Sequence, residues 1–179
     1  MTRSTAAQAT RPGTIPACVE NLLHWIGQLV ALGMTDLRVV AAQFPLGGRI
    51  ILVVDDEGPS REVLRYVLEA DGARVVTAAS ATEALSLLDE VRPDALLVDI
   101  SMPVVDGFTM VEQLRQRPIA KGGGIPVAAL TGYMSGEDRS RAFRSGFQAY
   151  LVKPVEPSEL VRTLRELTTS THSVTPSSP

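Results

Sequence analysis

Five short apolar runs recur along residues 49–167, and a helical pattern follows each of them. Short runs rich in Val, Ile, Leu or Ala are typical of strands buried on both faces of a sheet. They are Ile50–Val54, Arg74–Ala78, Ala95–Val98, Pro126–Leu130 and Ala149–Val152. Strands that alternate with helices in this way predict an α/β fold, with a parallel sheet and helices on both of its faces.

The helical patterns have apolar residues three or four positions apart, the spacing of one helix face. They run from Val63 to Leu68, Ala84 to Leu88, Phe108 to Leu114 and Leu160 to Leu167, with a weaker fourth pattern at Ala142 and Phe143. We expect Ser80 and Asp106 to cap the second and third helices, because their side-chain oxygens accept from free backbone N–H groups.

The flanking segments differ in composition from this repeat. Residues 1–48 are predicted to form an N-terminal extension, with a flexible arm over 1–16 and an amphipathic helix over 17–33. The apolar stripe of that helix packs either on its own domain or on a partner, which includes a second copy in a homodimer, and the sequence favours neither. Residues 168–179 are rich in Ser, Thr and Pro and are predicted to be a disordered tail.

Composition narrows the classes of function. The net charge of -3 over 179 residues, with 14 basic and 18 acidic groups in 49–167, excludes a generic nucleic-acid binder. One cysteine and two histidines exclude a disulfide framework and a Cys/His-rich metal site. The apolar stretch from Leu22 to Met34 is interrupted and shorter than the ~20 residues that span a membrane. We therefore expect a cytoplasmic protein that does not bind a membrane.

Charged and polar side chains follow the predicted strands at their carboxyl ends, where ligands bind in such sheets. Asp55 and Asp56 (with Glu57 behind them) follow the first strand, and Asp99 follows the third. Crowded carboxylates raise one another's pKa unless a cation compensates, and Mg²⁺ prefers oxygen ligands beside a phosphate. Thr131 and Lys153, at the fourth and fifth strand ends, supply a hydroxyl and an ammonium that suit phosphate oxygens. The pattern predicts a carboxylate that accepts a phosphoryl group.

With these motifs in order, residues 49–167 resemble the receiver domain of bacterial two-component response regulators, and also the receiver of hybrid sensor histidine kinases. The matching pieces are Asp55-Asp56-Glu57, Leu97–Pro103, Asp106-Gly107, Thr131-Gly132 and Tyr150 with Lys153-Pro154. The resemblance implies a flavodoxin-like, doubly wound sheet of five parallel strands in the order 2-1-3-4-5.

The resemblance also implies a metal site with Asp99 as the phosphoacceptor. Asp56 would hold Mg²⁺ directly and Asp55 largely through water. Asp99 and the backbone carbonyl of Ser101 would complete the protein's share of the ligands.

Three further roles are implied around the phosphoryl group. Lys153 would pair with Asp99 before modification and with the phosphoryl group afterwards, and its bond to Pro154 would be cis. Thr131 would move its hydroxyl onto a phosphoryl oxygen. Tyr150 would then turn inward behind Thr131 as the aromatic step of a switch.

These implications predict phosphorelay signal transduction by a single-domain response regulator. Asp99 would receive the phosphoryl group from a sensor histidine kinase or a histidine phosphotransfer protein, and the domain would assist its own phosphorylation and dephosphorylation without being an enzyme. Its affinity for an unknown downstream protein would change at a surface that carries Arg139, Arg141, Phe143 and Arg144. We expect no DNA-binding module, because 12 residues follow the last predicted helix.

Three alternatives stay open. The chain could be the receiver fragment of a hybrid sensor histidine kinase, because Leu37 to Pro45 faintly resembles the end of a kinase ATPase domain. It could be a phosphatase with an aspartyl-phosphate intermediate, although such enzymes usually have a second acidic residue two positions after the nucleophile, where this chain has Ser101. It could also be a degenerate receiver that binds its partner constitutively. The presence of all five expected site residues argues against this, namely Asp55, Asp56, Asp99, Thr131 and Lys153.

Overall fold

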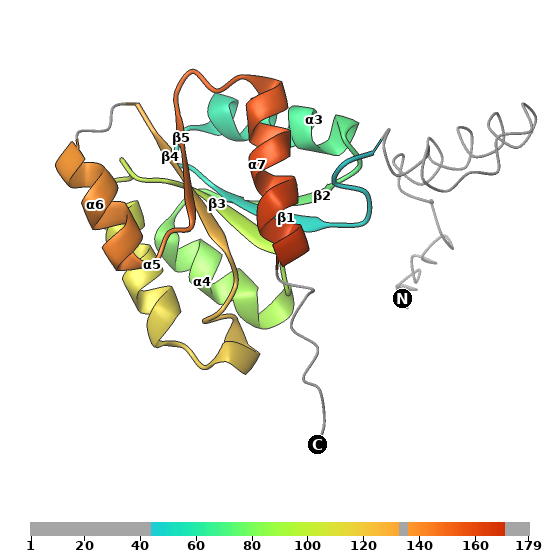
Figure 1. Ribbon diagram of the computed structural model, residues 1–179. Helices are drawn as coiled ribbons and strands as arrows, with labels where there is room; N and C mark the ends of the chain where they lie inside the picture. The colour runs from blue at the N-terminus through green and yellow to red at the C-terminus, as the bar shows by residue number, and fades with distance from the viewer. Residues whose placement is uncertain (1–43, 133–135, 171–179) are drawn as a thin grey trace, which may run out of the picture. The chain divides into compact units, whose positions relative to one another are not determined.

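The computed structural model describes residues 44–132 and 136–170. The predicted arm over 1–16, the helix over 17–33 and residues 171–179 of the predicted tail lie outside the described residues. Within them, strands and helices alternate along the chain (Figure 1). The elements are β1 (Ile50–Val54), α3 (Gly58–Ala70), β2 (Arg74–Ala78), α4 (Ala81–Glu90), β3 (Ala95–Asp99), α5 (Gly107–Gln116), the 3₁₀ turn η1 (Ile119–Lys121), β4 (Val127–Thr131), α6 (Gly136–Ser145), β5 (Ala149–Val152) and α7 (Pro157–Ser170).

The five strands form one sheet in the order β2-β1-β3-β4-β5, and every neighbouring pair is parallel. The predicted flavodoxin-like fold and its strand order are therefore confirmed. No helix among the described residues is long and apolar enough to cross a membrane.

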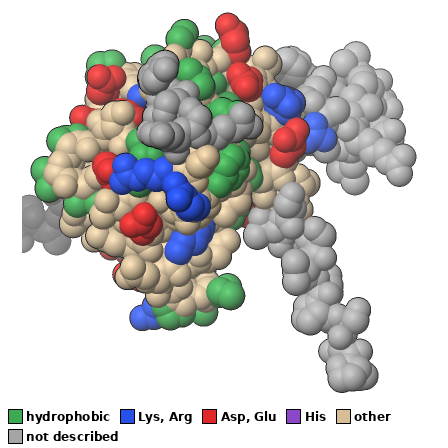
Figure 2. Space-filling model, turned by 60° about the vertical axis from the view of Figure 1, so that its left-hand side comes forward, with side chains coloured by type: hydrophobic (Ala, Val, Ile, Leu, Met, Phe, Trp, Pro, Cys, Tyr) green, Lys and Arg blue, Asp and Glu red, His purple; other side chains and the backbone are tan. Residues whose placement is uncertain are grey.

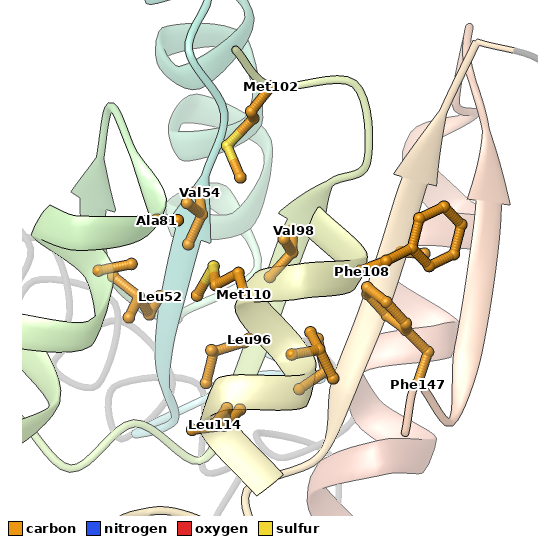
Figure 3. Packing of buried hydrophobic residues seen from close by; sticks show 14 of the residues in the cluster. Leu52, Val54, Ala81, Leu96, Val98, Met102, Phe108, Met110, Leu114 and Phe147 are labelled. Atoms are coloured by element: carbon orange, nitrogen blue, oxygen red, sulfur yellow. The ribbon is translucent and has the colours of Figure 1, made fainter. Parts of the chain in front are cut away.

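Alternate residues of the central strands supply two separate cores, because successive side chains of a strand point to opposite faces. Leu52 and Val54 of β1 belong to the core beneath α4, α5 and α6 (Figure 3). Ile51 and Val53 belong to the core beneath α3 and α7. Helices on both faces explain why the strands are continuous apolar runs, and why polar and charged side chains are left to the strand ends.

Both predicted helix caps are present. The Ser80 hydroxyl accepts a hydrogen bond from the Glu83 backbone N–H at 3.2 Å, at the start of α4. The Asp106 carboxylate accepts one from the Thr109 N–H at 2.7 Å, at the start of α5. Asp106 thereby fixes the first turn of the helix that follows the Asp99 loop.

Two boundaries differ from those predicted. Leu46, which we assigned to the extension, is fully buried in the α3/α7 core, and its N–H donates to the Asp71 carbonyl at 3.1 Å. Its Pro and Gly neighbours indicated a linker and gave no sign that the leucine packs. Helix α7 continues to Ser170, because Thr168 is buried and its hydroxyl donates to the Leu164 carbonyl at 2.9 Å.

Candidate functional site

Three carboxylates meet at the carboxyl edge of the sheet. Asp99 is the last residue of β3 and Asp55 directly follows β1, and these strands are neighbours with Val54 opposite Val98. One carboxylate oxygen from each of Asp55, Asp56 and Asp99 lies within 4.8 Å of the other two. The predicted convergence is therefore confirmed, while the role of each carboxylate stays a prediction.

The three carboxylates differ in their contact with solvent. Asp55 is completely buried and Asp99 is 5% exposed, whereas Asp56 is exposed. A buried carboxylate needs hydrogen-bond donors to replace its water. The donors around Asp55 and Asp99 therefore define the site.

Lys153 supplies a donor to both buried carboxylates. Its Nζ lies 2.9 Å from Asp55 Oδ2 and 2.7 Å from Asp99 Oδ2. Burial disfavours the ammonium, but the hydrogen bonds to Asp99 and Asp55 outweigh it and raise the pKa of Lys153 above its ordinary value. The ammonium thus balances part of the negative charge of the two carboxylates. The peptide bond between Lys153 and Pro154 is cis, as predicted.

Asp55 has two more donors, one of which sequence reasoning missed. The Glu57 N–H donates to Asp55 Oδ1 at 2.8 Å, and the Ser60 hydroxyl donates to Asp55 Oδ2 at 2.7 Å. Burial alone would raise the pKa of Asp55, but the bonds from Ser60, Lys153 and Glu57 hold it below its ordinary value. Ser60 stands five residues after Asp55 in the first turn of α3, and that spacing is the only signal that could have found it.

The loop after Asp99 is tightly shaped. The Ser101 N–H donates to Asp99 Oδ1 at 3.0 Å, so the carboxylate is fixed by its own loop as well as by Lys153. At Gly107 a Cβ atom would lie 2.5 Å from the Asp99 carbonyl oxygen, so only glycine fits. Val104, which is fully exposed, has a φ of 68°, a left-handed conformation that is costly for a β-branched residue.

Thr131 ends β4 next to the acidic group and is 4% exposed. Gly132 follows it, and a Cβ atom at Gly132 would meet nothing within 4 Å, so the space at that position is open. Tyr150 lies on β5 opposite Ala129 and is half-buried. Its ring makes an edge-to-face contact with Phe143 of α6, with 6.3 Å between ring centroids. The switch roles of Thr131 and Tyr150 stay predictions.

The chemistry of this donor set fits a hard divalent cation beside an anion. Carboxylate and carbonyl oxygens are the ligands that Mg²⁺ prefers, and three carboxylates with a single lysine leave negative charge for a cation to neutralise. Asp56 is the exposed member, so solvent reaches the cluster on its side.

A family model for the response regulator receiver domain matches residues 51–165. The chain is 48% identical over 116 residues to an uncharacterized 14.6 kDa protein from the sodA1 3′ region of Leptolyngbya boryana, an alignment that covers 65% of this chain and 87% of that protein. It is 37% identical over 117 residues to the phosphate regulon transcriptional regulatory protein PhoB of Escherichia coli. That alignment covers 65% of this chain and 50% of PhoB, so the chain matches about half of that relative's length.

Solved structures show the same similarity. The chemotaxis protein CheY4 of Vibrio cholerae aligns with a TM-score of 0.63 and 32% identity, over 66% of this chain and 98% of that one. The receiver domain of the sensor histidine kinase PA1611 from Pseudomonas aeruginosa aligns with a TM-score of 0.63 and 31% identity, over 69% of this chain and 99% of that one. The latter holds a magnesium ion coordinated in its active site cleft.

Proposed function

Because the chain belongs to the response regulator receiver domain family, we propose that Asp99 accepts a phosphoryl group from a phosphohistidine donor. One observation carries the proposal: Lys153 Nζ lies between Asp55 and Asp99, at 2.9 and 2.7 Å, inside a cluster of three carboxylates. This arrangement leaves one carboxylate beside a cation that can follow the negative charge onto a phosphoryl group.

In the proposed transfer, an Asp99 carboxylate oxygen forms a bond to phosphorus as the bond from phosphorus to the donor's imidazole nitrogen breaks. The imidazole leaves with the electron pair, and the protein keeps an acyl phosphate. Lys153 then pairs with a phosphoryl oxygen, and the Thr131 hydroxyl donates to another. Their positions at the ends of neighbouring strands β4 and β5 support this division of roles.

Mg²⁺ is the proposed cofactor. Asp56, Asp99 and the Ser101 carbonyl would hold the ion directly, and Asp55 would hold it largely through water. When bound, the ion neutralises negative charge that Lys153 alone does not balance. The magnesium in the similar PA1611 receiver supports this assignment.

The proposed output is a changed affinity for another protein at the surface formed by α6, β5 and α7. Figure 2 turns the α6 side toward the viewer and shows Lys and Arg side chains gathered on this face. Arg144 is exposed there and Phe143 is 49% exposed. Because Phe143 contacts Tyr150, an inward turn of Tyr150 would alter this exposed face.

We further propose a single-domain regulator that works with a separate sensor kinase or histidine phosphotransfer protein, with 1–48 as an extension. The similarity to the receiver of a sensor histidine kinase favours one alternative, a fragment of a hybrid kinase. An immunoblot of cells that express the natural gene separates the two. A band near 19.2 kDa supports the regulator, and a much larger band supports the fragment.

The direct test is incubation with acetyl phosphate and Mg²⁺, followed by intact-mass measurement of the wild type and of Asp99→Asn. One added phosphoryl group on the wild type alone is the expected result. Modification of both proteins, or of neither, would contradict the assignment of Asp99. Steady hydrolysis of p-nitrophenyl phosphate would instead support the phosphatase.

A further inference from the structure

Ser60 makes a contact with the acidic cluster that the proposed function does not use. Its hydroxyl donates to Asp55 Oδ2 at 2.7 Å, the same oxygen that accepts from Lys153 Nζ at 2.9 Å. Asp55 is completely buried, so these donors and the Glu57 N–H replace its water.

The bond joins Ser60 to the site and not to its own helix. A serine near a helix start commonly accepts from a free N–H of the first turn. Here Glu57 is the N-cap residue of α3 and makes no side-chain cap. The Ser60 hydroxyl instead points to the carboxylate. The Arg61 guanidinium donates to the Asp55 carbonyl at 2.6 Å, so α3 is fastened to this residue at two points.

The donors of Asp55 are not equally permanent. Lys153 divides its ammonium between Asp55 and Asp99, and in the proposed function it moves to a phosphoryl oxygen. Among the donors from the described residues, Asp55 then keeps the Glu57 N–H on Oδ1 and the Ser60 hydroxyl on Oδ2. Of the two side chains that donate to Oδ2, Ser60 is therefore the one that can hold it in place throughout the cycle.

We propose that Ser60 is a positioning residue that fixes the Asp55 carboxylate for Mg²⁺ binding, an inference that rests on the proposed function. A donor behind a metal-holding carboxylate limits its rotation, and loss of such an outer partner typically weakens metal binding about tenfold or more. Thr at position 60 keeps the hydroxyl, whereas Ala removes it.

The test is calorimetric titration of Mg²⁺ into the full chain at pH 7, without a phosphoryl donor. Ser60→Ala is expected to bind Mg²⁺ about tenfold more weakly than the wild type, and Ser60→Thr about as tightly. Ser86→Ala is the matched control, because Ser86 is an exposed helical serine whose hydroxyl donates to the Thr82 carbonyl of its own helix at 3.0 Å. Its affinity should equal that of the wild type.

Urea unfolding with EDTA and with Mg²⁺ separates positioning from simple stability. A purely structural role would lower stability equally in both media, whereas positioning reduces the extra stability that Mg²⁺ gives. Ser60→Cys, of similar volume but a weaker donor, serves as the variant if Ser60→Ala does not fold, and should bind Mg²⁺ with intermediate affinity.

Two negative results have different meanings. Equal Mg²⁺ affinity of Ser60→Ala and the wild type overturns the role of Ser60 and leaves the proposed function standing. A wild type that binds no Mg²⁺ overturns the proposed metal site, and the role of Ser60 with it.

Discussion

Two substitutions in the acidic cluster should affect the free energy of unfolding differently, although each removes one member of the same ion pair. Lys153→Met removes the cation and leaves the carboxylates facing one another. Asp99→Asn removes one carboxylate and leaves Lys153 paired with Asp55. We expect the first to destabilise the protein without Mg²⁺ and the second to leave it unchanged or more stable.

The cost of losing Lys153 follows from its two contacts. At an effective dielectric constant of about 20, charges 2.7 to 2.9 Å apart attract by about 6 kcal/mol in each pair. The desolvation cost of the buried ammonium disappears with the side chain and offsets much of this sum. Loss of one partner from a buried pair typically costs about 3–5 kcal/mol. Lys153 is 28% exposed, which places the expected loss near 3 kcal/mol of unfolding free energy.

The balance is different at Asp99. Its removal also forfeits one attraction of about 6 kcal/mol. It relieves a repulsion from Asp55 of at least about 3.5 kcal/mol, because the facing oxygens lie within 4.8 Å. It also recovers the several kcal/mol that burying a carboxylate costs. The expected change in unfolding free energy lies between zero and a gain of about 2 kcal/mol.

Urea unfolding monitored by circular dichroism, at pH 7 with EDTA, measures both changes. Glu69→Gln is the control for a lost acidic charge, because Glu69 is exposed on α3, and it should change stability by less than about 0.5 kcal/mol. If Asp99→Asn is destabilised as much as Lys153→Met, the carboxylates do not repel one another as their separation requires. The electrostatic reasoning would then be refuted.

Four further predictions concern the loop and helix after Asp99. Asp106→Ala should cost about 1 kcal/mol in urea unfolding, because the cap on Thr109 is lost. Burial would raise the pKa of Asp106, but hydrogen bonds from Thr109 hold it below its ordinary value. The ionised carboxylate therefore stabilises the fold above about pH 4, and this stabilisation is lost as the pH falls further. Between pH 5 and 2 the wild type should lose more stability than Asp106→Asn. Val104→Gly should raise the free energy of unfolding in urea by about 1 kcal/mol, because glycine adopts the left-handed φ without strain. Gly107→Ala should cost about 1–3 kcal/mol and slow acetyl phosphate labelling, because its methyl group would press on the Asp99 carbonyl.

The fold was predictable because its signals are local and repeated. Each buried parallel strand shows as an apolar run, and each helix shows its periodicity or its cap, as at Ser80 and Asp106. The boundaries were less predictable, because they depend on tertiary contacts. Leu46 packs against distant helices, and Thr168 extends α7 through a bond to Leu164, and neither event has a local signature.

The charged residues of the site could be predicted from the sequence, but the hydrogen bonds that hold them in place could not. Asp55, Asp99 and Lys153 stand at strand ends, and parallel topology brings all strand ends to one edge. The supporting contacts depend on side-chain directions that the sequence does not specify. In the sequence Ser60 resembles any serine in a first helical turn, and only the structure shows that its hydroxyl donates to Asp55 Oδ2.

The same distinction explains how this edge tolerates two buried carboxylates. A strand end places Asp55 where water is excluded, so the charge must be balanced by groups that arrive from elsewhere in the chain. Ser60 belongs to the next helix, α3. Lys153 stands 98 residues after Asp55 and follows β5, an edge strand of the sheet. The local donor is fixed by α3, whereas the distant one is shared with Asp99 and can be redirected. A carboxylate held by one permanent and one transferable partner can stay in place while the cation beside it changes its contacts, as the proposed acceptance of a phosphoryl group by Asp99 requires.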